Sequence, residues 1–357
     1  MNLRVLVVDD TIMYRKVVGD ILAEIPGIEV VGTANNGKIA LTRIASLKPD
    51  LITLDVEMPI MNGLETLQEI QKSFPDVGVI MLSTLTKRGS DITMRALELG
   101  AFDFIAKPDA EVMQENVQLL RSAIQPRVKA FAKRLELRSL LKQRHRPVGA
   151  PAPTPAAPSV LASSRRTGKS KAVAIGISTG GPNALTKMLP QLPKLGVPIF
   201  VVQHMPPVFT KSLAESLDSK CQYEVREAEN NEVVRPDVIY IAPGGKHMRV
   251  ASGTGGAKII QVTDDPPENN CKPAADYMFR SVAREYGALS TGVIMTGMGG
   301  DGTLGLKVLK SFGAVTIGQD EESCVVYGMP KIAVEAGVVD VVSPLQMIAS
   351  EIIRTVR

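Results

Sequence analysis

A serine, a histidine and an aspartate occupy positions that suit them to hydrolysis. Ser178 is the central residue of a G-x-S-x-G pattern, GISTG at 176–180, between an apolar run and a helical pattern. In that setting the serine lies on a sharp turn with its hydroxyl exposed. A nucleophilic serine needs a general base, and His204 ends the next apolar run. Asp301, in the glycine-rich segment TGMGGDG, offers a carboxylate that could orient this base.

Other interpretations of these residues remain open. Glycine-rich turns between a strand and a helix also bind phosphate, although neither the lysine of a P-loop nor the acidic residue of a dinucleotide site follows at the required spacing. Two further histidines, His145 and His247, lie in a basic segment and in the middle of the second half. We favour His204 because its strand is expected beside that of Ser178. The order Ser, His, Asp also differs from the order in α/β-hydrolases.

A second set of chemically capable residues follows apolar runs near the N-terminus. Asp9 and Asp10 follow the first run, Asp55 ends the third, Ser83 ends the fourth and Lys107 follows the fifth. The carboxyl ends of parallel strands meet at one edge of a sheet, so these side chains should converge. Three neighbouring carboxylates favour a divalent cation, and oxygen ligands favour Mg²⁺. A cation beside a nucleophilic carboxylate, a hydroxyl and an ammonium suits phosphoryl transfer.

The elements that position these residues can be read from the hydrophobic pattern. Short apolar runs alternate with helical patterns in the first part, at Leu3–Val8, Val30–Ala34, Leu51–Leu54, Val77–Leu82 and Phe102–Ile105. Such alternation predicts an α/β fold with a parallel sheet covered on both faces. The second part alternates less regularly, with strands expected near Ala172–Ile177, Pro198–Gln203 and Gly292–Thr296. We expect a doubly wound α/β domain there, with a small antiparallel insertion at 223–263.

A proline- and alanine-rich segment, Pro147–Pro158, separates the two parts. Its composition cannot form a core and predicts a flexible linker with extended character. Before it, residues 127–146 carry a net charge of +7 and have partly helical spacing, which predicts a helix extending from the first domain. We therefore expect a first domain at 1–126, a basic helix and linker at 127–170, and a second domain at 171–357.

Composition excludes several classes of protein. The chain carries a net charge of +4. Residues 127–146 contribute +7 and residues 165–171 contribute +4, so the remainder of the chain carries −7. With no tryptophan either, nucleic-acid binding is not expected. The three cysteines show no metal or disulfide spacing, which favours a reducing compartment. No apolar run is long enough to span a bilayer and Met1–Arg4 shows no signal-peptide pattern, so we expect a cytoplasmic protein that is not inserted in the membrane.

The first set of motifs resembles response-regulator receiver domains over about residues 3–125. The resemblance rests on the acidic residues, Asp55-Val-Glu-Met-Pro and Lys107-Pro108. It implies a flavodoxin-like parallel sheet of order 2-1-3-4-5. It also implies that Asp55 accepts a phosphoryl group, and that Mg²⁺ is held by Asp9, Asp10, Asp55 and the main-chain carbonyl of Glu57.

The same resemblance assigns roles to other receiver residues. Ser83 would be the switch hydroxyl and Lys107 the contact to the phosphoryl group. Phe104 stands where the family frequently has a switch tyrosine, and Asn62 stands where an aspartate often precedes the glycine. Neither departure removes a group that phosphorylation requires.

Together, the motifs GISTGGP, QHMPP and TGMGGDG after a receiver domain resemble the chemotaxis protein-glutamate methylesterases, the CheB family. The resemblance spans both domains and implies hydrolysis of glutamate γ-methyl esters on chemoreceptors, with release of methanol, and often deamidation of receptor glutamines. Ser178 would be the nucleophile, His204 the general base and Asp301 its orienting group. The main-chain N–H of Met298, with that of Thr179, would stabilise the oxyanion.

The family also implies partners and a mode of regulation. Methyl-accepting chemoreceptors would be substrates and a chemotaxis histidine kinase the phosphodonor, with Mg²⁺ required only at the receiver and a monomeric protein expected. We hypothesise that phosphorylation of Asp55 relieves inhibition of the second domain. The main alternative is a phosphorylation-gated binding module without catalysis, which a serine-directed covalent probe would distinguish. A transcription factor would need a basic recognition helix in the second domain, whereas the basic residues concentrate at 127–146 and 165–171. A general serine esterase is less firmly excluded.

Overall fold

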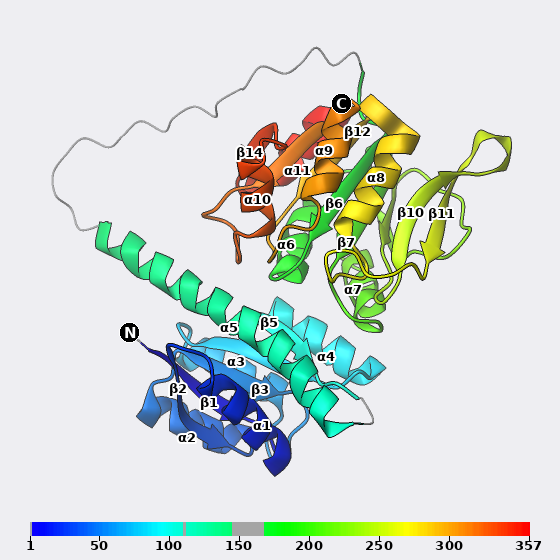
Figure 1. Ribbon diagram of the computed structural model, residues 1–357. Coiled ribbons are helices and arrows are strands. Elements are labelled where there is room, and N and C mark those ends of the chain that lie inside the picture. Colours follow the sequence, from blue (N-terminus) through cyan, green and yellow to red (C-terminus); the bar gives the residue numbers. More distant parts are fainter. Residues whose placement is uncertain (1, 110–111, 145–167) are drawn as a thin grey trace. The chain divides into compact units, whose positions relative to one another are not determined.

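The computed structural model describes residues 2–109, 112–144 and 168–357 (Figure 1). The chain divides into two compact units, Met1–Arg146 and Pro147–Arg357. The proline-rich segment predicted to be a linker and His145 lie outside the described residues.

The first unit contains a five-stranded parallel sheet. Its order is β2-β1-β3-β4-β5, as predicted. The strands are β1 Leu3–Val8, β2 Ile28–Ala34, β3 Leu51–Asp55, β4 Gly78–Ser83 and β5 Asp103–Ala106. Every residue of β3 is buried, which explains its unbroken apolar run.

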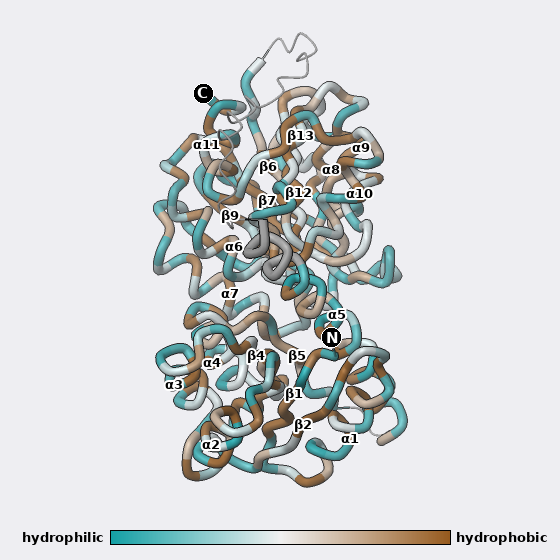
Figure 2. Tube along the Cα trace, turned by 90° about the vertical axis from the view of Figure 1, so that its left-hand side faces the viewer, coloured by the Kyte–Doolittle hydropathy of each residue, from teal (hydrophilic) through white to brown (hydrophobic). Residues whose placement is uncertain are grey.

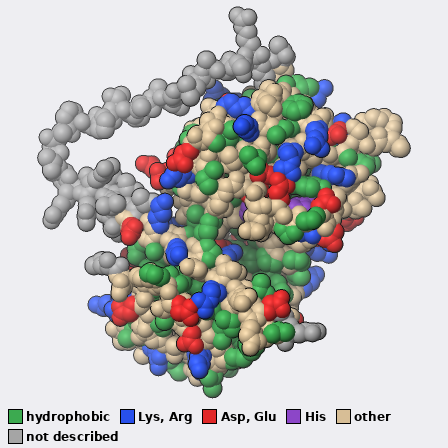
Figure 3. All heavy atoms as spheres, viewed as in Figure 1, with side chains coloured by type: hydrophobic (Ala, Val, Ile, Leu, Met, Phe, Trp, Pro, Cys, Tyr) green, Lys and Arg blue, Asp and Glu red, His purple; other side chains and the backbone are tan. Residues whose placement is uncertain are grey.

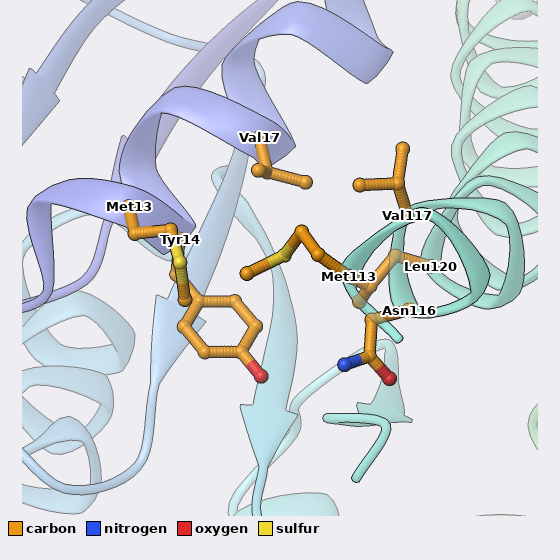
Figure 4. Close-up of a pocket in the computed structure, with 7 residues that line it drawn as sticks. All are labelled: Met13, Tyr14, Val17, Met113, Asn116, Val117 and Leu120. Atoms are coloured by element: carbon orange, nitrogen blue, oxygen red, sulfur yellow. The ribbon is translucent and has the colours of Figure 1, made fainter. Parts of the chain in front are cut away.

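Helices cover both faces of this sheet (Figure 1). Helix α1, Ile12–Ala23, packs with α5, Met113–Arg144, while the opposite face carries α2 Gly37–Leu47, α3 Gly63–Ser73 and α4 Lys87–Glu98. The side chains of α1 and α5 leave a hollow of about 30 Å³ (Figure 4). Its lining is Met13, Tyr14, Val17, Met113, Asn116, Val117 and Leu120. The lining is predominantly apolar and offers no set of side chains suited to catalysis or to metal binding.

Helix α5 continues past residue 126, where we expected the first domain to end, although Pro126 removes one helical hydrogen bond. Phe131 is buried, and its ring packs edge-to-face on Phe102 with centroids 5.1 Å apart. Arg127 Nε lies 3.0 Å from Asp103 Oδ2. The beginning of the expected basic segment therefore packs on the first unit as part of α5.

The second unit is built on a seven-stranded parallel sheet. Its order is β14-β13-β12-β6-β7-β9-β8. The strands are β6 Ala172–Ile177, β7 Ile199–Gln203, β8 Glu224–Glu227, β9 Val238–Ile241, β12 Ser290–Ile294, β13 Val315–Gln319 and β14 Val341–Ser343. The hydrophobic segments of Figure 2 follow the inner strands of each unit, where most strand residues are buried.

Helices flank this sheet on both sides, as predicted for a doubly wound domain. One face carries α6 Gly181–Met188, α7 Phe209–Asp218 and α11 Leu345–Val356; the other carries α8 Ala275–Tyr286, α9 Thr303–Ser311 and α10 Met329–Glu335. Short 3₁₀ turns lie at Leu189–Gln191, Thr254–Gly256 and Gly287–Leu289.

None of the described helices combines the length and apolar character that a membrane span requires. On the face shown in Figure 3, acidic and basic side chains are interspersed.

The antiparallel part is smaller than the predicted insertion at 223–263. Within it, β10, His247–Ser252, pairs antiparallel with β11, Lys258–Thr263, and a single antiparallel bridge joins Val233 to Ile259. Strands β8 and β9 instead extend the main sheet in parallel, so the prediction was wrong for these two strands. The reason is burial: all four residues of β9 are buried, as in an inner strand of a covered sheet.

The strand order reverses beside β6. From β6 the chain adds strands on one side through β7, and later on the other side through β12 (Figure 1). In open α/β sheets, ligands bind outside the carboxyl ends of the strands at such a reversal. Ser178 directly follows β6, His204 directly follows β7, and the glycine-rich segment follows β12.

Candidate active site

Strand pairing places Ser178 and His204 beside each other. Ile177 of β6 is in register with Gln203 of β7, so the next residue of each strand is Ser178 and His204. The His204 N–H donates to the Ile177 carbonyl at 3.1 Å. The buried Gln203 amide donates to the carbonyls of Ser178 at 3.0 Å and His204 at 3.1 Å. Sequence analysis missed this role of Gln203, which ties the two main chains together.

The glycine-rich segment after β12 packs directly against Ser178. The Ser178 N–H donates to the Thr296 carbonyl at 2.9 Å, and the Thr296 hydroxyl donates to the Thr179 carbonyl at 3.0 Å. A Cβ at Gly297 would lie 2.7 Å from Ser178 Cβ and 2.4 Å from Met329 Sδ. Only glycine at 297 therefore permits the segment to approach the serine this closely.

Asp301 holds the imidazole of His204 from one side. His204 Nε2 lies 2.7 Å from Asp301 Oδ2. The buried Asp301 carboxylate also accepts bonds from the N–H groups of Ala275 and Asp276, at 2.6 and 3.1 Å, and from Asn269 Nδ2 at 3.1 Å. Burial opposes ionisation of Asp301, but the bond from His204 and the other donors keep its pKa below the usual value.

Cys271 approaches the other side of the same imidazole. Its Sγ lies 3.7 Å from His204 Nδ1. Burial lowers the pKa of His204, but hydrogen bonds and charge interactions with Asp301 and Cys271 outweigh it and raise the pKa to about 9. Sequence analysis missed Cys271 and Asn269, because neither lies at a motif spacing that relates it to His204.

The remaining predicted groups surround Ser178. In the part of the chain described, no hydrogen bond joins the Ser178 hydroxyl to His204, and hydrogen bonds of this kind commonly tighten only when substrate binds. Among the described residues, the N–H groups of Thr179 and Met298 have no acceptor. Both are thus available to a developing oxyanion.

His247 has a structural environment. It is fully buried, its Nε2 lies 3.1 Å from the Pro266 carbonyl, and its Nδ1 accepts the Ala274 N–H at 3.3 Å. Its ring also stacks on Tyr277 with centroids 4.5 Å apart. Both ring nitrogens are therefore engaged away from Ser178.

The acidic cluster of the first unit surrounds Lys107. The Lys107 ammonium lies 2.8 Å from Asp9 Oδ2 and 2.8 Å from Asp55 Oδ2, and all three side chains are buried. Burial raises the pKa of Asp55 to about 6, although the charge of Lys107 acts in the opposite direction. Lys107 also lies 4.5 Å from the ring centroid of Tyr14.

The donor set fits Mg²⁺. Asp9, Asp10 and Asp55 bring carboxylate oxygens within 4.8 Å of one another. Apart from Lys107, Asp9 Oδ2 has no polar partner among the described residues. An open cavity of about 500 Å³ adjoins the cluster and is lined in part by Asp10, Asp55 and Glu57. Oxygen ligands beside an open, solvated cavity match the preference of Mg²⁺, which retains several waters.

The two predicted switch residues are buried. The Ser83 hydroxyl donates to the Gly89 carbonyl at 3.1 Å and does not line the cavity, whereas the hydroxyl-bearing Thr84 does. Phe104 is buried in β5, in register with Met81 of β4. Contact of the Ser83 hydroxyl with a phosphoryl group on Asp55 would therefore require its side chain to reorient.

Comparison with known proteins identifies the family. The CheB methylesterase family model matches residues 173–352, and the response regulator receiver domain model matches residues 5–144. The chain belongs to the CheB methylesterase family. The receiver match includes α5 beyond residue 126.

Relatives of this CheB-family chain match along its whole length. A protein-glutamate methylesterase/protein-glutamine glutaminase of Desulfotalea psychrophila is 56% identical over 100% of this chain and 99% of its own length. The protein of the same name from Bacillus subtilis is 44% identical over 99% of each chain. The crystal structure of the Thermotoga maritima CheB methylesterase catalytic domain is 44% identical, with a TM-score of 0.51, and covers 52% of this chain and 98% of that one.

These matches confirm the predicted family, the α/β fold of both units and the enzyme class. The chain is a methylesterase-family hydrolase that carries a response-regulator receiver domain. The individual site residues remain predictions, supported by the geometry above.

Proposed function

We propose that this protein removes methyl groups from glutamate γ-methyl esters of methyl-accepting chemoreceptors, releases methanol, and deamidates receptor glutamines. The observation that carries the proposal is the placement of Ser178 beside His204 at the ends of β6 and β7, with His204 bonded to Asp301. A hydroxyl, a base and an orienting carboxylate in this relation support acyl transfer.

Ester cleavage begins with attack of the Ser178 hydroxyl oxygen on the ester carbonyl. His204 Nδ1 accepts the serine proton, because Nε2 is held by Asp301. The N–H groups of Thr179 and Met298 then donate to the oxyanion. The imidazolium returns its proton to the departing methoxide, which leaves as methanol and gives an acyl-serine.

A water molecule completes the reaction. His204 Nδ1 takes one proton from the water, and the resulting hydroxide attacks the acyl-serine. The imidazolium returns that proton to Ser178 as the glutamic acid leaves, and the acid then loses its remaining proton to solvent. A glutamine side chain follows the same course, with ammonia as the leaving group. Asp301 remains ionised throughout and stabilises the imidazolium of each step.

The receiver provides control. A chemotaxis histidine kinase in the cytoplasm donates a phosphoryl group to Asp55, and Mg²⁺ held by Asp9, Asp10, Asp55 and the Glu57 carbonyl would neutralise the charge developed in that transfer. Lys107 contacts the new phosphoryl oxygens, and Ser83 turns from the Gly89 carbonyl toward them. The added charge of about −1.5 to −2 changes the receiver surface, including that near Phe104, and raises the activity of the second unit.

The test is methanol release from methyl-esterified receptor fragments. Wild-type protein should release methanol, and Mg²⁺ with a small phosphodonor should raise the rate. Asp55→Ala should keep the basal rate and lose the stimulation. Equal rates with and without phosphodonor would reject the gating. Absence of release under every condition would reject the esterase and favour a binding module.

A further inference from the structure

We propose that Cys271 and His204 form a site for a soft divalent cation of the Zn²⁺ type, which shuts down hydrolysis when bound. Cys271 Sγ, a His204 ring nitrogen and an Asp301 carboxylate oxygen lie within 4.8 Å of one another. Thiolate and imidazole are the ligands that Zn²⁺ selects over Mg²⁺. The site is therefore chemically distinct from the all-oxygen cluster of the receiver.

The separation of the two ligand atoms fits a tetrahedral ion. Cys271 Sγ and His204 Nδ1 are 3.7 Å apart. Bonds of about 2.3 Å from Zn²⁺ to sulfur and about 2.0–2.1 Å to nitrogen, at a tetrahedral angle, place these two atoms about 3.6 Å apart. An ion could thus replace the thiol proton between them with a shift of about a tenth of an ångström.

Asp301 acts in this site by orienting a ligand. Its two oxygens accept bonds from His204 Nε2, two main-chain N–H groups and Asn269, which leaves Nδ1 of His204 directed at Cys271. A carboxylate bonded to the far nitrogen of a histidine is the usual support of a histidine metal ligand, because it fixes the ring and raises its basicity.

The cysteine is held on a rigid turn. The main chains of Glu268 and Cys271 exchange two hydrogen bonds, at 3.1 and 2.8 Å. The Arg280 guanidinium donates a hydrogen bond to each carboxylate oxygen of Glu268, both at 2.6 Å. Asn269 of the same turn donates to the Asp301 carboxylate. The ligands are thus positioned before an ion arrives. Cys271 is partly exposed, which leaves a route for the ion and for water at its remaining positions.

Binding conserves charge and protons in a simple exchange. Zn²⁺ bonds to Nδ1 of His204 and to the sulfur of Cys271, and the thiol proton leaves to solvent; below the His204 pKa of about 9, the Nδ1 proton of the ring leaves to solvent as well. The bound ion then occupies the lone pair that must accept the Ser178 proton. This inhibitory effect rests on the proposed function, whereas the metal site itself does not.

The site is tested in the full-length protein with Co²⁺ as a spectroscopic probe. Excess Mg²⁺ is present so that the receiver carboxylates do not bind Co²⁺. One equivalent of Co²⁺ should produce the near-ultraviolet sulfur-to-metal charge-transfer absorption and the visible bands of a tetrahedral ion, and Zn²⁺ should abolish both. This readout requires no enzymatic activity.

Three matched variants assign the ligand. Cys271→Ser should lose the charge-transfer absorption, while Cys221→Ser and Cys324→Ser should keep it. Burial raises the pKa of Cys221 to about 11 and that of Cys324 further, so these thiols are poor ligands. Circular dichroism confirms that each variant is folded. Absence of the absorption in wild type, or its persistence in Cys271→Ser, would overturn the site.

Methanol release measures the inhibitory effect. Zn²⁺ should inhibit wild type and a chelator should restore the rate, with each protein compared to its own zinc-free rate. Cys271→Ser should need at least about tenfold more Zn²⁺ for half-inhibition, since loss of a residue that merely supports a ligand already costs about 10- to 100-fold in affinity. Stoichiometric Zn²⁺ binding without inhibition would overturn the regulatory part. A protein without esterase activity would fail the proposed function, and Co²⁺ spectra would still decide the site.

Discussion

His204 bonds Asp301 through Nε2, at 2.7 Å, so that Nδ1 is the ring nitrogen that Asp301 leaves unbonded. The same Nδ1 faces Cys271 at 3.7 Å. In the proposed mechanism this nitrogen accepts the Ser178 proton, and the structure places the Cys271 thiol against the same atom. This relation determines how the site should respond to mutation and pH.

Replacement of the nucleophile provides the first prediction. Ser178→Ala should lower kcat for methanol release by about 10⁴-fold or more, as expected when one member of a catalytic triad is removed. Ser219→Ala, at an exposed serine of the same unit, should retain wild-type kcat. A Ser178→Ala protein with more than a tenth of the wild-type rate would exclude the serine as nucleophile.

Gln203 should act as a positioning residue. Gln203→Met keeps the length of the side chain but removes the bonds to the carbonyls of Ser178 and His204. We expect kcat to fall by about 10- to 100-fold with little change in KM, because small misplacement of reacting groups is costly. Gln191→Met, at an exposed glutamine, is the control. A raised KM at unchanged kcat would contradict this role.

The pH dependence should follow His204. Its pKa is raised to about 9, and only the neutral ring can accept the serine proton, so kcat/KM should rise with pH up to about 9. Cys271→Ser should move the midpoint to lower pH, because the hydrogen bond and charge of Cys271 help to raise the pKa of His204. Rates are measured in the presence of a chelator. A profile that is flat from pH 6 to 9 would contradict the prediction.

Lys107 should stabilise the receiver by neutralising buried carboxylates. Lys107→Met leaves Asp9 and Asp55 without their buried cation, and removal of one partner of such a cluster costs about 3–5 kcal/mol. Mg²⁺ should recover part of this loss. So should a pH below about 6, where Asp55, whose pKa is already raised, becomes protonated.

Urea unfolding followed by circular dichroism measures these changes in the full-length protein. Lys72→Met, which removes an exposed ion pair with Glu69, should change the free energy of unfolding by no more than about 0.5 kcal/mol. Equal stability of Lys107→Met with and without Mg²⁺ would show that the carboxylates do not bind the ion.

Gly297 should be required for the shape of the active site. A Cβ at this position would meet Ser178 Cβ at 2.7 Å and Met329 Sδ at 2.4 Å, so Gly297→Ala must displace the serine or the glycine-rich segment. We expect kcat to fall by about 10²-fold, the cost of a displacement near 1 Å. Gly19→Ala, inside helix α1, is a control for the substitution itself, because a Cβ there meets no atom within 4 Å and the backbone is helical. Wild-type kcat in Gly297→Ala would contradict the tight contact.

Much of the scaffold could be predicted from sequence, because local hydrophobic periodicity encodes elements directly. The run Leu3–Val8 is β1 and the run Ala172–Ile177 is β6, both as expected. Ser178 and His204 could be placed together because consecutive parallel strands are usually neighbours. Local patterns could not show that Val238–Ile241 joins the main sheet, since a short apolar run fits several sheet positions.

The sequence by itself determined the two α/β units, their family, and the acidic and serine-containing strand ends. Only the tertiary structure decided which atoms meet there. The turn that carries Asn269 and Cys271 reaches His204, which lies 67 positions before Cys271 in the chain, through packing of α8 against the sheet. The bond of Nε2 to Asp301 and the orientation of Ser83 toward Gly89 likewise depend on packing. Residue spacing encodes local elements, whereas contacts between distant turns arise only when those elements pack together.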